Sequence, residues 1–195
     1  MNLLLDPIYA FVFLGLFSPG PNVILLTASG ARFGFKRTLP HLLGVVLGVG
    51  LIAGLTAFGL GAILIAMPSL TFVLKVLAAL WILWMAWGLW NSKPREIDGT
   101  DMPMTFLQAV LFQWVNPKIW AVALTAVSVY SSGLTPIGEA LRLASAFSGI
   151  NFFVCMFWTF AGTLLTYLLS SEIAWYNFMR LMALALVAFS IMIFV

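Results

Sequence analysis

Six long apolar stretches constrain this chain more than any other feature of its sequence. Each has about 20 residues or more, which is the length that a helix needs to cross the ~30 Å hydrocarbon core of a bilayer. Only 8% of the residues are charged, whereas soluble domains have roughly 25%. The sequence therefore predicts an all-α membrane protein with six transmembrane helices and no soluble domain. The stretches are residues 3–27, 39–67, 70–90, 105–130, 144–169 and 173–195.

The first stretch has an alternative interpretation as a cleaved signal peptide. Residues 1–6 contain no basic residue, and the apolar run continues too far for such a peptide. We therefore expect the stretch to remain as a transmembrane span. Residues 1–195 are then expected to form a single transmembrane domain.

The distribution of Lys and Arg predicts the orientation of the chain. Five of these residues lie in two short connections, 31–37 and 91–104, and short connections that are rich in Lys and Arg face the cytoplasm. Both termini are then expected outside, in the periplasm. Lys75 and Arg142 oppose this arrangement, because both lie on the outer side.

A turn-rich, charged linker at residues 93–104 separates the six stretches into two sets of three. Three spans per set require the second set to be inserted upside down, which is the inverted-repeat construction of many secondary transporters. We expect repeat 1 at residues 1–92, a cytoplasmic linker at 93–104 and repeat 2 at 105–195. Each repeat opens with a stretch that is broken in its middle.

The first break is Ser18-Pro19-Gly20-Pro21-Asn22. Its two prolines lack a backbone donor and obstruct helical carbonyls one turn earlier. Gly20 between them permits backbone angles that other residues avoid. The helix is therefore expected to stop and restart here.

The second break is Gln113-Trp114-Val115-Asn116-Pro117-Lys118, inside the fourth stretch. Asn116 suits the cap of a helix N-terminus, and Pro117 suits the first helical turn. Two half-helices are therefore predicted in this stretch as well.

The breaks are candidate binding sites for a small solute. Unpaired backbone in hydrocarbon costs several kcal/mol per group, so such breaks persist only when they are buried in protein or line a watery cavity. A restarted half-helix also presents free N–H groups and a positive dipole end, which favour an amino-acid carboxylate. Ordinary proline kinks are the alternative, but matching breaks in two repeats favour a site. The candidate substrate-binding residues are Ser18, Pro19, Gly20, Pro21, Asn22, Gln113, Asn116, Pro117 and Lys118.

Other functional classes lack the residues that they require. The six acidic residues lie almost entirely in connections, so no constellation for an enzyme is evident. Cys155 is the only cysteine and His41 the only histidine, which excludes a dithiol pair and argues against a metal site. No cofactor is expected. The net charge of +3 is interpreted as a topology signal, so no nucleic-acid partner is expected.

The ordered set of motifs resembles the LysE family of amino-acid exporters, also called RhtB. The shared residues are the first break, the segment 30–37 (GARFGFKR), the glycines Gly44 and Gly48, and Val115-Asn116-Pro117-Lys118. The resemblance implies a six-helix, multi-pass protein of the bacterial inner (cytoplasmic) membrane that exports amino acids or their derivatives. It also implies a proton-driven mechanism, contacts with the lipid bilayer and, in many members, a homodimer.

Two expectations about function follow from the sequence. No mid-membrane carboxylate is evident that would neutralise a cationic side chain, so the expected substrate is a small neutral amino acid or derivative. The alternative function is that of a non-transporting assembly or scaffold subunit in the membrane, which composition alone does not exclude.

Overall fold

The computed structural model describes residues 6–93, 102–169 and 171–194. All regular secondary structure among these residues is helical, which confirms the predicted all-α class. The elements are α1 (Pro7–Phe17), α2 (Pro21–Leu55), a π-helical turn η2 (Thr56–Leu60), α3 (Gly61–Ala66), α4 (Pro68–Trp90), α5 (Phe106–Val115), α6 (Pro117–Val129), α7 (Pro136–Leu168) and α8 (Glu172–Met192).

Helix length and composition alone give fewer spans than the six that the sequence predicts. Four helical segments in the described ranges are long and apolar enough to cross a membrane, or five if α5 and α6, bent by 64°, form one broken span. The 11-residue α1 is too short to cross by itself. The connection between the apolar stretches 105–130 and 144–169 is also shorter than these bounds imply, because α7 already begins at Pro136.

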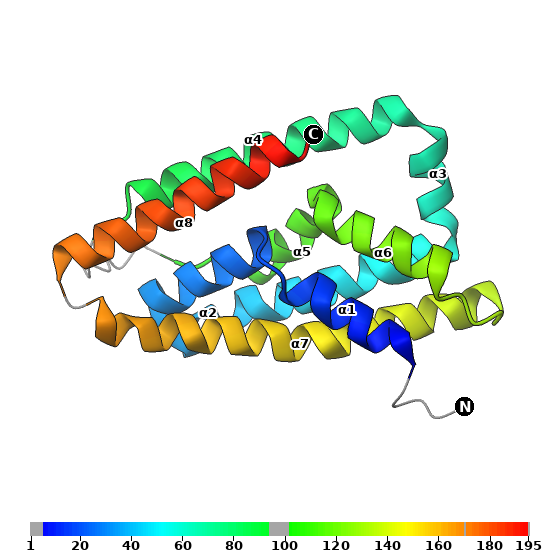
Figure 1. Cartoon of the computed structure of the whole chain (residues 1–195), viewed down its shortest axis with the longest axis horizontal. Coiled ribbons are helices and arrows are strands. Elements are labelled where there is room, and N and C mark those ends of the chain that lie inside the picture. Colours follow the sequence, from blue (N-terminus) through cyan, green and yellow to red (C-terminus); the bar gives the residue numbers. More distant parts are fainter. Residues whose placement is uncertain (1–5, 94–101, 170, 195) are drawn as a thin grey trace.

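The chain reverses direction within α2. Gly34 has φ 77° and ψ 167°, a left-handed backbone conformation that glycine adopts readily. Ser29 Oγ and His41 Nδ1 lie 3.4 Å apart although they are 12 positions apart in the sequence, a separation that would span ~18 Å in a straight helix. The two parts of α2 therefore fold back on each other (Figure 1). The reversal falls inside the connection predicted at 31–37.

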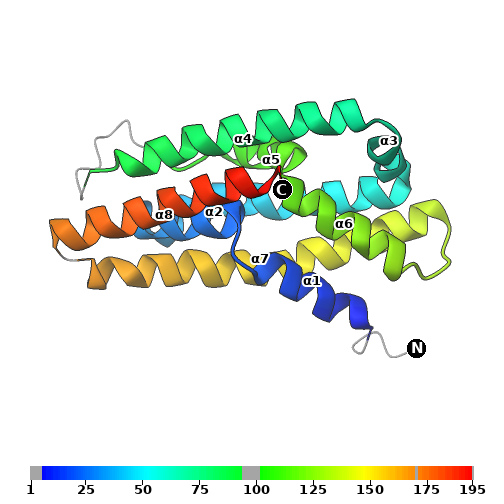
Figure 2. The same cartoon turned by 45° about the horizontal axis from the view of Figure 1, so that its top comes forward.

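Two helix pairs organise the bundle. α4 runs beside α8 on one side, and α7 runs beside α2 on the other (Figures 1 and 2). The α2–α7 contact brings the two backbones together, because a Cβ atom on Gly162 would lie 2.1 Å from the Thr27 carbonyl oxygen and one on Gly30 would lie 2.3 Å from that of Thr159. Small residues at such positions allow helices to approach closely in membranes.

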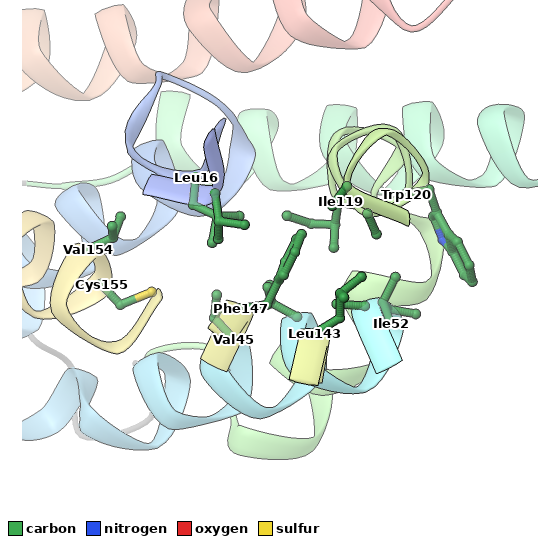
Figure 3. Close-up of a cluster of buried hydrophobic side chains, with 14 of the residues drawn as sticks. Leu16, Val45, Ile52, Ile119, Trp120, Leu143, Phe147, Val154 and Cys155 are labelled. Carbon is green, nitrogen blue, oxygen red and sulfur yellow. The ribbon is translucent and has the colours of Figure 1, made fainter. Parts of the chain in front are cut away.

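The core connects the broken segments to α7. Figure 3 shows Leu16 of α1, Ile119 of α6 and Phe147 of α7 pointing toward one another. Large apolar side chains also cover the outer surface, where for example Phe153 and Trp87 are 72% and 69% exposed. A surface of this kind suits hydrocarbon, because it requires no contact with water.

Candidate functional site

The two predicted breaks are present and meet inside the bundle. α1 ends at Phe17 before α2 begins at Pro21, and α5 ends at Val115 before α6 begins at Pro117. Asn22 Nδ2 donates to Gln113 Oε1 at 2.8 Å, and Gln113 Nε2 donates back to Asn22 Oδ1 at 3.1 Å. This reciprocal amide pair ties the first break to the second.

Asn116 occupies the N-cap position of α6, with Pro117 at the first helical position, as predicted. Its side chain does not cap the helix, however. The Asn116 Nδ2 atom instead donates to Gln113 Oε1 at 3.4 Å, and Gln113 Nε2 donates to the Ala109 carbonyl at 3.0 Å. Gln113 is fully buried. Its hydrogen bonds therefore fix the Asn116 side chain at the second break from inside the protein.

The expectation that Gly20 provides an unusual backbone conformation is wrong. Its φ of −177° and ψ of 178° describe extended backbone, which any residue adopts. The requirement for glycine is steric, because a Cβ atom at this position would lie 2.8 Å from Lys118 Cδ and 2.9 Å from Lys118 Nζ. Gly20 therefore makes room for the lysine side chain of the second break.

Lys118 bridges the two breaks with its ammonium group. Lys118 Nζ donates to the Ser18 carbonyl and, at 3.4 Å, to the Pro19 carbonyl. These carbonyls follow the C-terminal end of α1, which carries a partial negative charge because the last helical carbonyls have no partner within the helix. A cation at this position stabilises the interrupted end of the half-helix.

A small cavity with a few polar lining groups lies between the restarted half-helices and α7. The volume that the centre of a water molecule can occupy in this cavity is about 10 Å³, which is enough for about one water molecule. Three buried polar atoms of its lining residues have no hydrogen-bond partner in the part of the chain that the structure describes: Asn116 Oδ1, Asn151 Nδ2 and Trp158 Nε1. The lining residues are Leu16, Gly20, Asn22, Val23, Leu26, Asn116, Lys118, Ile119, Asn151, Val154, Cys155 and Trp158.

The structure separates the predicted site residues into three groups. Four of them line the cavity: Gly20, Asn22, Asn116 and Lys118. Three others support the cavity. Pro21 and Pro117 start the half-helices, and Gln113 forms hydrogen bonds with the side-chain amides of Asn22 and Asn116. Ser18 and Pro19 are exposed and contribute their carbonyl groups to Lys118.

Sequence reasoning missed Asn151 and Trp158, which α7 contributes to the cavity. Asn151 is the only amide residue in the apolar stretch 144–169, and a polar side chain within a membrane helix normally faces the protein interior. That signal identifies Asn151 as a candidate. No comparable signal distinguishes Trp158, because tryptophan is common in packing and at membrane interfaces.

Ion pairs connect the start of α1 to α7, away from the cavity. Arg142 Nη2 lies 2.6 Å from Asp6 Oδ2, and Arg142 Nη1 lies 3.3 Å from Glu139 Oε2. The Ile8 backbone N–H and the Arg142 guanidinium lower the pKa of the Asp6 carboxyl, which precedes α1. Arg142 thus pairs with two carboxylates, one of which precedes α1.

A larger groove of about 660 Å³ lies between α4 and the α5–α6 segment. Apolar residues such as Leu64, Phe72 and Trp120 dominate its lining, and Lys75 is its only charged residue. Specific solute sites place a few convergent polar groups in an apolar pocket. The small cavity between the breaks has such groups, and the groove largely lacks them.

Comparison with known proteins agrees with this arrangement. Residues 13–195 match the family model described as LysE type translocator. The chain belongs to the LysE family. The match includes both breaks and the α7 residues of the cavity. This LysE-family protein is therefore a multi-pass inner-membrane transporter and not an enzyme.

Curated relatives of the LysE-family chain are efflux proteins. The cysteine/O-acetylserine efflux protein of Escherichia coli O1:K1 / APEC is 27% identical over 157 residues, which cover 80% of this chain and 77% of the relative. The protein of the same name from Shigella flexneri serotype 5b (strain 8401) is 27% identical over 158 residues, which cover 81% and 78%. No solved structure matches the chain.

Proposed function

We propose that this LysE-family protein is a proton-coupled secondary transporter that exports small amino acids or their derivatives. The observation that carries the proposal is the meeting of two half-helix N-termini at one cavity with partnerless polar atoms. The names of the curated relatives, cysteine/O-acetylserine efflux proteins, support an amino-acid substrate.

The carboxylate of the amino acid is proposed to bind at the starts of α2 and α6. The first amides of a helix have no carbonyl partner within it, and its N-terminus carries about half a positive charge. Residues from the starts of both helices line the cavity, among them Val23 and Ile119. The Lys118 ammonium adds a full positive charge to the same wall.

The charge of the lining favours a neutral side chain on the substrate. Lys118 is the only Lys, Arg, Asp or Glu among the residues that line the cavity. A cationic side chain would lie near this ammonium without a carboxylate partner, which is unfavourable inside a membrane. A small apolar or hydroxyl side chain avoids that cost.

The proposed topology has six spans in two inverted repeats. The reversal at Gly34 lets α1 and the first part of α2 form one broken span, and α5 with α6 forms its counterpart. The amide pair of Asn22 and Gln113 joins the restarted half of one broken span to the first half of the other, so the two breaks lie side by side. Of the proposed linker 93–104, residues 94–101 lie outside the described residues.

Transport requires the cavity to open, because even the smallest amino acid is several times larger than the single water for which it has room. The breaks provide hinges for this movement, since the half-helices on either side are not joined by continuous helical hydrogen bonds. Alternating movement of one repeat against the other would expose the site to each side of the membrane in turn.

The test is a competitive efflux assay in a sensitive host that expresses the protein. We expect raised tolerance and extracellular accumulation for neutral members of a panel of threonine, homoserine, cysteine, leucine and lysine. A protonophore should abolish this efflux. Selective export of lysine or arginine, unaffected by Asp6→Asn, would contradict the neutral-substrate proposal. Absence of all efflux, together with no stabilisation by any amino acid, would support the scaffold function instead.

A further inference from the structure

One face of α7 contributes four residues to the cavity. Asn151, Val154, Cys155 and Trp158 follow one another at spacings of three, one and three residues, and all four line the cavity. Residues at these spacings lie on one side of a helix. In Figure 3, Val154 and Cys155 lie on α7 within the same interior cluster as Leu16 and Ile119. The cavity therefore has a third wall besides the two breaks.

This wall holds donors that the folded protein does not use. Asn151 is 3% exposed, and neither its Nδ2 atom nor Trp158 Nε1 has a hydrogen-bond partner in the structure. A buried donor without a partner destabilises a fold. Two such donors in one cavity are therefore unfavourable for folding unless something else in the cavity accepts their hydrogen bonds.

We infer that α7 forms the third wall of the substrate site, where Asn151 and Trp158 add side-chain donors to the half-helix amides that bind the carboxylate of the amino acid. The inference rests on the proposed export function and extends its carboxylate site to α7. A carboxylate is an acceptor only. The two partnerless donors match it.

The remaining lining selects the side chain of the substrate. Apolar residues complete the cavity, namely Leu16, Val23, Leu26, Ile119 and Val154. A short uncharged side chain fits such surroundings without leaving a buried polar group unpaired. The site thus recognises the carboxylate by hydrogen bonds and the side chain by size.

The test compares Asn151→Leu and Trp158→Phe with the wild type as purified full-length protein. The probes are the best-exported amino acid of the efflux panel and its carboxamide, which lacks the carboxylate. We expect each substitution to weaken binding of the amino acid about tenfold or more, as for a lost hydrogen bond to a charged group. Binding of the carboxamide should change little. The unfolding temperature should not fall, because each substitution removes a partnerless donor.

Trp175→Phe is the matched control for Trp158→Phe. Trp175 Nε1 donates to the Ser92 carbonyl at 3.3 Å, outside the cavity. This variant should lose stability and retain affinity for the amino acid, the opposite of Trp158→Phe. A purely structural role of Trp158 would instead make both variants behave alike.

Cys155 provides an independent measurement, because it is the only thiol in the chain and lines the cavity. The amino acid should slow labelling of Cys155 by a membrane-permeable maleimide in the wild type but not in Asn151→Leu, with Cys155→Ser as the unlabelled control. Unchanged affinity and protection in Asn151→Leu and Trp158→Phe would overturn the inference and leave the proposed export function intact. If the wild type neither exports nor binds any amino acid of the panel, the proposed function itself fails.

Discussion

Gly20→Ala provides a direct test of how the two breaks fit together. The extended backbone at this position accepts alanine without strain, so replacing glycine should stabilise the protein by about 0.4–1 kcal/mol through the unfolded state. The new Cβ, however, would lie 2.8 Å from Lys118 Cδ and 2.9 Å from Lys118 Nζ. The lysine side chain must move and give up its bonds to the Ser18 and Pro19 carbonyls.

The expected loss follows from these two effects. Hydrogen bonds to a charged group contribute about 1.5–3 kcal/mol. After the gain from the unfolded state is subtracted, Gly20→Ala should destabilise the protein by about 1–2 kcal/mol. For a chain of this size each kcal/mol corresponds to roughly 2–4 °C in the unfolding temperature. The variant should also export less, because Lys118 lines the cavity.

A double-mutant cycle in detergent separates the clash from other effects. In a Lys118→Ala background the clash is absent, so Gly20→Ala should be neutral or stabilising by up to about 1 kcal/mol. Gly149→Ala is the matched control, since its Cβ would contact nothing within 4 Å, and it should not destabilise. If Gly20→Ala is equally costly with and without Lys118, the steric reasoning is refuted.

Three further predictions concern the helix breaks, the outer ion pair and the topology. Pro21→Ala and Pro117→Ala should impair efflux more than expression, because each lets a half-helix continue and withdraw its free amides; normal export by both would disprove the broken-helix site. Asp6→Asn should lower the unfolding temperature at neutral pH. Folding lowers the pKa of the Asp6 carboxyl, so this group stabilises the protein at pH values above its unfolded pKa of 3.8. The stabilisation disappears as the pH falls through the folded pKa. The difference in unfolding temperature between the two proteins should therefore shrink as the pH falls below 3.8, and a constant difference would exclude the ion pair with Arg142 as the cause. Reporter fusions at Val195 should be active only in the periplasm, and cytoplasmic activity would overturn the proposed orientation.

Local chemistry made several features predictable from the sequence. Proline cannot continue a helix, so both interruptions could be located at Pro21 and Pro117. The position of Asn116 at the start of α6 followed from the preference of short polar residues for helix caps. The reversal at Gly34 lies inside the connection that its basic residues marked. Each of these features depends on a residue and its immediate neighbours in the chain.

Contacts between distant segments could not be predicted in this way. The role of Gly20 depends on Lys118, almost a hundred residues later in the chain. The ion pair of Arg142 likewise depends on the distant Asp6. Asn151 and Trp158 face the cavity only because α7 packs against both breaks.

The sequence by itself therefore determined an all-helical membrane protein and the positions at which its helices break. The reason is that bilayer thickness and backbone geometry act on local segments. Only the tertiary structure decided that the breaks meet and that α7 closes the cavity. Both outcomes depend on how helices pack, which is a property of surfaces that several separate segments build together.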